Sequence, residues 1–256
     1  MEINGYLIES GALLSNADLF GADLSGATLS KAKLNGACLD RANLRMANLN
    51  EADLSGAKLR TADLYEAELN LAVLYAADLY EANLSKAQLI YADLTGAVLY
   101  QANLYGADLT KACLRMSILS NSDMQKAKLN GVDLVGAVLR NANLSLTEIE
   151  ESDLSSTDLV QAKLISASLR KTCLRNANLT MANLYCAKLS DSDLTGANLS
   201  GADLTSVDLR NSNLTEANLI GANLTSANLD NAFLNGTNST GAILTGATLP
   251  DGTTHN

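Results

Sequence analysis

Apolar and polar residues recur along this chain with a period of five. From Ala12 to Leu249 the sequence runs through 48 consecutive five-residue units without a slip in register. The central position is Leu in 45 units, and the position two residues earlier is Ala in 37. The residue between them is Asp or Asn in 27 units, and the last two positions are polar or mixed. Each unit therefore carries two apolar residues at fixed positions.

Neither a regular helix nor a flat strand buries this pattern on one side. On an α-helix a step of five residues advances about 140°, which spreads the leucines around every side. On a strand an odd period moves each successive Leu to the opposite face. Residues two apart do point the same way in a short extended segment. We therefore predict a coil of short sides, with Ala and Leu inside and a corner after each Leu.

The residues at the predicted corner support this arrangement. Fifteen of the 17 glycines, and six asparagines, occupy the position directly before the inward small residue. A type II turn requires a positive φ there, which Gly adopts freely and Asn more readily than most residues. Leu71, Tyr91 and Leu146 occupy the same position in other units. We therefore expect that some corners use a different turn.

Stacking of the coils is required on energetic grounds. Burying one Leu and one Ala stabilises a unit by about 2.5–4 kcal/mol, whereas ordering its five residues costs about 5–10 kcal/mol. Coils that share a hydrogen-bond ladder exclude Pro, and the one proline, Pro250, directly follows the last unit. The number of sides stays open, because three and four sides align the replacements of Ala about equally well. Four sides place these five in one column: Val132, Ser152, Thr172, Ser192 and Ser212.

The A-[D/N]-L-x-x pattern over residues 12–249 resembles the pentapeptide-repeat family. The resemblance implies an all-β fold, a right-handed quadrilateral β-helix with four repeats per coil and about 12 coils here. The Leu-rich and Asp/Asn-rich repeats and the ending LPDGT are similar to those of cyanobacterial members.

The sequence predicts three segments: a cap at 1–14, the β-helix at 15–249 and a tail at 250–256. We expect the cap to be a short helix or loop that covers the first coil with its apolar residues, Tyr6, Leu7, Ile8 and Leu13. At the other end Phe233 and Ile243 occupy outward positions, and the tail is expected to fold over them. The alternative is a homodimer through the C-terminal coils, as the resemblance implies for some members.

Composition and charge point away from membranes and nucleic acid. No apolar run approaches the roughly 18 residues of a membrane span, and the start lacks the basic region of a signal peptide, so we expect a cytoplasmic protein. The net charge is −10, distributed as −1, −6, +3 and −6 over residues 1–50, 51–110, 111–190 and 191–256. The net positive charge over residues 111–190 argues against the interpretation of the protein as a DNA mimic, and direct binding of nucleic acid is not expected.

No catalytic, cofactor or metal site is expected. The one histidine, His255, is next to last, and the sequence has no P-loop or dinucleotide fingerprint. Four cysteines without C-x-x-C spacing are expected to stay reduced: Cys38, Cys113, Cys173 and Cys186. Stacked Asp133, Asp153 and Asp193 favour a solvated face over a calcium site, because Cys173 interrupts them.

Two groups of outward side chains are candidates for binding. Six tyrosines between Tyr65 and Tyr105 are expected to stack on cross-strand neighbours, with a binding patch as the alternative. With twenty residues per coil, one strip replaces Asp or Asn by apolar residues: Val98, Ile118 and Val138, with Tyr100 and Met116 beside them. We predict a non-enzymatic scaffold that binds an unknown protein partner, with this strip as the candidate site and ordinary pleated β-surface as the alternative for the strip. The alternative, from the resemblance, is a DNA mimic that binds a type II topoisomerase (gyrase).

Overall fold

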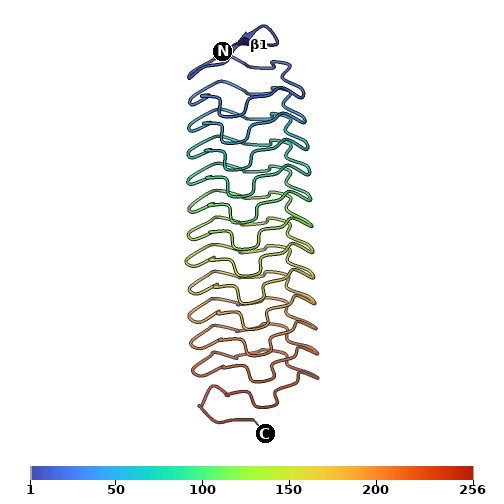
Figure 1. The fold of residues 1–256 in the computed structure, drawn as a ribbon. Coiled ribbons are helices and arrows are strands. Elements are labelled where there is room, and N and C mark those ends of the chain that lie inside the picture. Colours follow the sequence, from blue (N-terminus) through green and yellow to red (C-terminus); the bar gives the residue numbers. More distant parts are fainter. Residues whose placement is uncertain (1, 256) are drawn as a thin grey trace. The chain divides into compact units, whose positions relative to one another are not determined.

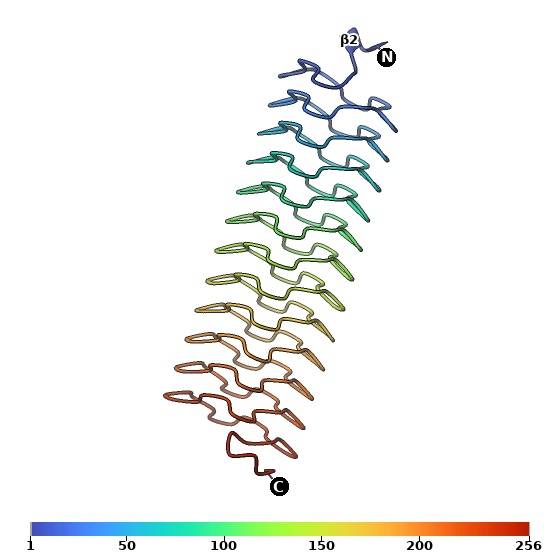
Figure 2. The same ribbon diagram turned by 90° about the vertical axis from the view of Figure 1, so that its left-hand side faces the viewer.

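A computed structural model describes residues 2–255 and divides the chain into two compact units, Met1–Lys128 and Leu129–Asn256. Two short strands stand apart from the repeats, β1 at Glu2–Ile3 and β2 at Tyr6–Leu7. The described residues contain no helix; the repeats consist of single bridged residues that alternate with turns. Figures 1 and 2 show these turns from two sides, in blue to green for the first unit and in yellow to red for the second.

Within each unit, residues twenty positions apart lie side by side in parallel register. In the first unit Asp23 pairs with Asn43, which pairs with Asp63. In the second unit Asp133 pairs with Asp153 in the same way. Four five-residue units therefore make one turn, which decides between the three-sided and four-sided alternatives that the sequence leaves open.

Backbone hydrogen bonds join each turn to its neighbours along the walls and at the corners. The Leu24 N–H donates to the Asn43 carbonyl at 2.7 Å, and the Asn43 N–H donates to the Ala22 carbonyl at 2.9 Å. At the corner, the Gly26 N–H donates to the Arg45 carbonyl at 2.8 Å. Because each turn uses these groups in the same way, the ladder does not depend on which outward side chain a position carries.

The predicted inward residues form the core of both units. Leu at the central position is fully buried through most of each unit, and so is the small residue two positions earlier. Where Ser or Thr replaces Ala, the hydroxyl usually finds a backbone acceptor: Thr157 Oγ1 donates to the Leu154 carbonyl at 2.7 Å, and Ser212 Oγ donates to the Leu209 carbonyl at 2.6 Å. A buried hydroxyl is tolerated where this bond is made.

The corners differ from the prediction, because all of them have a positive φ. Leu71, Tyr91 and Leu146 have φ values of 60°, 59° and 62°, close to the 63° of Gly26. An L-residue in this conformation is strained by about 1–2 kcal/mol. Hydrogen bonds on both sides hold the corner in place: the Leu71 N–H donates to the Ile90 carbonyl and the following Ala72 N–H to the Leu69 carbonyl. Neighbouring turns therefore impose the conformation even on bulky residues.

The N-terminal segment is a β-hairpin where the sequence predicts a short helix or loop. Strands β1 and β2 pair antiparallel across Asn4 and Gly5, which both have a positive φ, as a tight two-residue hairpin requires. Ile8 is buried, and the Tyr6 hydroxyl accepts a hydrogen bond from the Asp18 N–H at 3.3 Å. Leu13 is 84% exposed, so it does not take part in the expected apolar cover.

The end of the C-terminal tail pairs with the wall of Thr248. Thr254 bridges antiparallel to Thr248, and His255 exchanges backbone hydrogen bonds with Gly246 and Ala247. Phe233 and Ile243 remain 59% and 51% exposed. The expectation that the tail folds over these two side chains is therefore wrong, because its backbone pairs with residues on a different wall.

Candidate interaction surface

The predicted apolar strip lies in part on one wall of the first unit. Val98 and Ile118 are bridged directly to each other, and Ile118 is 41% exposed. Met116, at the preceding corner, is 67% exposed, while Tyr100 is partly buried. Val138 belongs to the second unit, where it is bridged to Asp158. The structure thus brings Val98 and Ile118 together and places Val138 opposite a carboxylate of its own unit.

The tyrosines stack less than the sequence predicts. Tyr80 and Tyr100 form one parallel stack, with ring centroids 5.7 Å apart and planes 11° apart. Tyr65 instead contacts two cations, since the Arg45 guanidinium lies 4.2 Å and the Lys86 ammonium 5.2 Å from its ring centroid. Cation–aromatic contacts of this kind are favourable by about 0.5–1 kcal/mol at exposed sites.

Lysine–tyrosine pairs recur one turn apart on the first unit. Lys111 Nζ donates to the Tyr91 hydroxyl at 3.0 Å, and Lys126 Nζ lies 5.3 Å from the ring centroid of Tyr105. The hydrogen bond to the neighbouring tyrosine raises the pKa of each of these lysines. Sequence reasoning missed these pairs, although a Lys twenty or twenty-one residues after a Tyr is a signal once the turn length is known.

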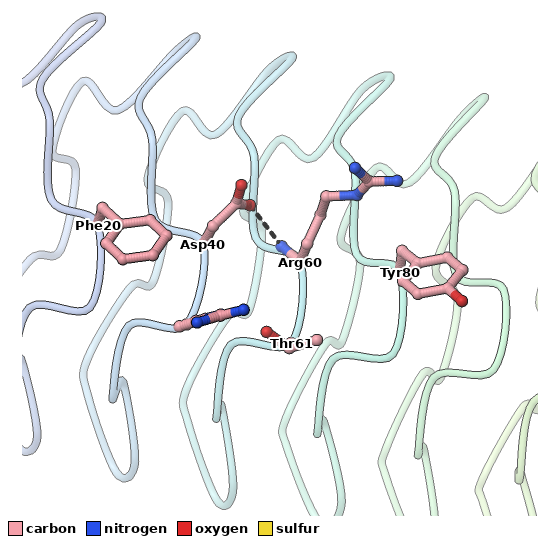
Figure 3. A pocket seen from close by; sticks show the side chains of 6 residues that line it. Phe20, Asp40, Arg60, Thr61 and Tyr80 are labelled. Atoms are coloured by element: carbon pink, nitrogen blue, oxygen red, sulfur yellow. Dashed lines mark hydrogen bonds between the residues drawn. The ribbon is translucent and has the colours of Figure 1, made fainter.

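An open hollow of about 430 Å³ lies at one corner of the first unit (Figure 3). Two aromatic rings mark its ends, and polar side chains from the turns between them complete its lining. The lining residues are Phe20, Asp40, Arg41, Arg60, Thr61 and Tyr80. Sequence reasoning did not identify the hollow, because its residues lie on four successive turns and become neighbours only through stacking.

The two arginines of the hollow have different surroundings. Arg60 is held on three sides: its Nε lies 3.0 Å from Asp78 Oδ2, its backbone N–H donates to Asp40 Oδ1 at 2.8 Å, and its guanidinium lies 5.3 Å from the Tyr80 ring centroid. Arg41 rests only on the ring of Phe20, with 5.7 Å from Cζ to the centroid. Within residues 2–255 no carboxylate lies within ion-pair distance of Arg41.

The outward aspartates are engaged in local hydrogen bonds. Asp53 Oδ1 accepts from the backbone N–H and the hydroxyl of Ser55, and the Ser55 hydroxyl is the main reason that the pKa of Asp53 is lowered. Asp153 Oδ1 accepts the same pair of bonds from Ser155. Among the described residues, no group of three His, Cys, Asp or Glu side chains could hold a metal ion. The four cysteines, which all lie within the described residues, form no disulfide.

The part of the chain that the structure describes holds no helix long and apolar enough to cross a membrane.

Comparison with known families identifies the repeat. Eight copies of the family model described as pentapeptide repeats match the chain. They cover residues 10–45, 37–74, 47–85, 77–115, 117–155, 149–180, 182–221 and 222–251. The model therefore accounts for nearly the whole chain.

Solved structures of similar chains include other pentapeptide repeat proteins. HetL from the cyanobacterium Nostoc sp. strain PCC 7120, a pentapeptide repeat protein involved in heterocyst differentiation regulation, is 35% identical. The match covers 94% of this chain and 90% of HetL, with a TM-score of 0.46. Rfr23, a pentapeptide repeat protein from the cyanobacterium Cyanothece 51142, is 34% identical over 41% of this chain and 58% of its own, with a TM-score of 0.24.

A more distant similarity links the chain to QnrB1, a plasmid-mediated fluoroquinolone resistance protein. The identity is 18%, the match covers 77% of this chain and 86% of QnrB1, and the TM-score is 0.36. No curated protein sequence matches the chain. The family-model matches and the identity with HetL over most of both chains lead to one conclusion: the chain belongs to the pentapeptide-repeat proteins.

Proposed function

We propose that this protein is a non-enzymatic scaffold that binds a regulatory protein partner through the outward side chains of its repeats. HetL is described as involved in the regulation of heterocyst differentiation, and its similarity supports a regulatory role here. The twenty-residue register within each unit supports a right-handed quadrilateral β-helix of about 12 coils. A cytoplasmic location is part of the proposal.

The observation that carries the proposal is the bridged pair Val98 and Ile118. Both occupy the outward position that is Asp or Asn in most units, and Met116 adds an exposed apolar side chain at the adjoining corner. Exposed apolar side chains on a rigid backbone lose little conformational entropy on binding. Together with Tyr100, these residues form the part of the proposed partner site that lies on the first unit.

The test compares two matched double variants. Val98→Lys with Ile118→Lys places two charges in the strip, whereas Val73→Lys with Cys113→Lys places them at equivalent outward positions on another wall of the same unit. We expect binding to a partner captured from the source cell to fall at least about tenfold in the strip variant, a loss of about 1.4 kcal/mol. The control should bind as the wild type does. Equal binding by both variants would show that the strip is ordinary β-surface.

A DNA mimic that binds gyrase is the second candidate, and the net charge of −10 favours it. The net charge of +3 over residues 111–190 interrupts the acidic surface that such a mimic requires. A gyrase supercoiling assay separates the two candidates, because the scaffold should have no effect at micromolar concentration. Inhibition that high salt reverses would favour the mimic.

A homodimer through the C-terminal coils is a further part of the proposal. Phe233 and Ile243 are exposed at that end, beside an apolar hollow of about 190 Å³ whose lining includes Leu234 and Leu244. Two exposed apolar side chains next to an uncovered core favour self-association. Light scattering should give the mass of a dimer for the wild type and of a monomer for Phe233→Ser with Ile243→Ser. A monomeric wild type at all concentrations would contradict this.

A further inference from the structure

The hollow at the corner of the first unit contains an arginine, Arg41, whose guanidinium has no acceptor among residues 2–255. Arg41 is exposed, and Phe20 supports its guanidinium from one side. Arg45 and Arg60, on the same unit, each lie 3.0 Å from an aspartate oxygen. A guanidinium presents five donors in a fork that matches a carboxylate or phosphate. Arg41 is therefore available to an acidic group from another molecule.

A second free donor lies one turn further along. Thr61 follows Arg41 by twenty residues, and its hydroxyl makes no hydrogen bond within residues 2–255. Figure 3 shows Thr61 between the rings of Phe20 and Tyr80, together with Asp40 and Arg60. An acidic group placed between the turns of Arg41 and Thr61 would reach both donors.

The spacing of the two rings matches an extended peptide. Phe20 and Tyr80 lie three turns apart, which corresponds to about 14 Å at about 4.8 Å per turn. Four residues of an extended chain also span about 14 Å, and residues i, i+2 and i+4 point to the same side. The residue at i+2 would lie about 7 Å along this path, between the turns of Arg41 and Thr61.

We propose that the hollow binds an extended segment of a protein partner in which one acidic residue is flanked, two residues away on each side, by apolar residues. Arg41 and Thr61 hold the carboxylate, and the apolar side chains contact the parts of the Phe20 and Tyr80 rings that Arg41, Arg60 and Tyr100 leave uncovered. This inference rests on the proposed role as a protein-binding scaffold and assigns a class of ligand to a surface separate from the strip. Nucleic acid is the less suitable ligand, because residues 1–128 carry 15 acidic and 11 basic side chains and repel a polyanion.

Fluorescence polarisation with the full chain tests the proposal. The probe is a labelled peptide with the core Leu-Ser-Asp-Ser-Leu. One comparison peptide has Asn in place of Asp, and another has one extra Ser before the second Leu, which turns that Leu to the opposite side. We expect both changes to weaken binding about tenfold.

Two matched protein variants locate the site. Arg41→Gln should weaken binding of the probe about tenfold, whereas Arg45→Gln, with the same change of charge outside the hollow, should leave it within about twofold. Both side chains are at least partly exposed, and circular dichroism should show that both variants fold. Equal weakening by the two variants would overturn the proposal, because it would indicate a general charge effect. Absence of binding at about 1 mM protein would overturn it as well.

Competition identifies the acidic group. Inorganic phosphate or a DNA oligonucleotide, at matched ionic strength, should not displace the probe; displacement by either at micromolar concentration would assign the hollow to phosphate ligands and overturn the proposal. Binding of the probe to the hollow does not depend on whether the strip binds a partner. Probe binding that is lost in Arg41→Gln but kept in the Val98→Lys, Ile118→Lys variant supports the hollow even if the strip binds nothing.

Discussion

The positive φ at the corners can be tested by exchanging Gly and Ala in both directions. Gly26, Gly56 and Gly96 have φ values of 62–67°, and a Cβ added at any of them would meet nothing within 4 Å. Ala76 occupies the same position of another unit with a φ of 53°. Substitution at these four positions therefore changes the backbone preference and little else.

The expected magnitude follows from two opposing effects. An L-residue in the left-handed region is strained by about 1–2 kcal/mol, while Ala lowers the entropy of the unfolded chain and recovers about 0.4–1 kcal/mol. Each Gly→Ala change should therefore cost about 0.5–1 kcal/mol, and the triple variant about 1.5–3 kcal/mol, because well-separated sites add. Ala76→Gly should increase the free energy of unfolding by about 0.5–1 kcal/mol.

Thermal melting and urea unfolding, followed by circular dichroism, measure these differences. For a chain of this length 1 kcal/mol corresponds to roughly 2–4 °C in the melting temperature. Gln161→Ala is the control, because it exchanges one L-residue for another at an exposed corner with a φ of 58°. A triple variant as stable as the wild type, or an Ala76→Gly variant less stable than it, would refute the assigned corner conformation.

Three further predictions concern the core and the surface carboxylates. Leu104→Asp buries an unpaired charge and should cost more than about 3 kcal/mol, so a melting temperature within a degree or two of the wild type would contradict the inward position of Leu. Ser122 Oγ is the one buried side-chain oxygen in residues 2–255 without a hydrogen-bond partner, so Ser122→Ala should stabilise the protein by about 1 kcal/mol. Ser212→Ala is the control, because it removes a hydrogen bond and should not stabilise the protein. The side-chain hydrogen bond from Arg210 lowers the pKa of Asp208 in the folded protein. The ionised Asp208 therefore stabilises the fold above about pH 4, and this contribution is lost as the pH falls through the pKa of Asp208 in the folded protein. As the pH is lowered through this region, the melting temperature should fall less for Asp208→Asn than for the wild type.

The period of five was sufficient to identify the inward residues. Leu and the small residue before it are buried because apolar side chains leave water wherever the chain folds, and this preference is a property of each residue. The missing N–H of Pro250 similarly marked the end of the repeats, and the Asn4–Gly5 pair contained a hairpin signal that the prediction of a helix or loop overlooked.

The turn length, the corners and the candidate hollow depended on tertiary structure. Backbone hydrogen bonds are the same for every residue, so the sequence alone did not distinguish pairing at twenty residues from pairing at fifteen. The same ladder imposes a positive φ on Leu71 and Tyr91, against their local preference. The hollow forms only when the turns stack, because its lining residues Phe20, Arg41 and Tyr80 lie on separate turns. The register of the stack brings them together, and no local sequence pattern between them indicates this.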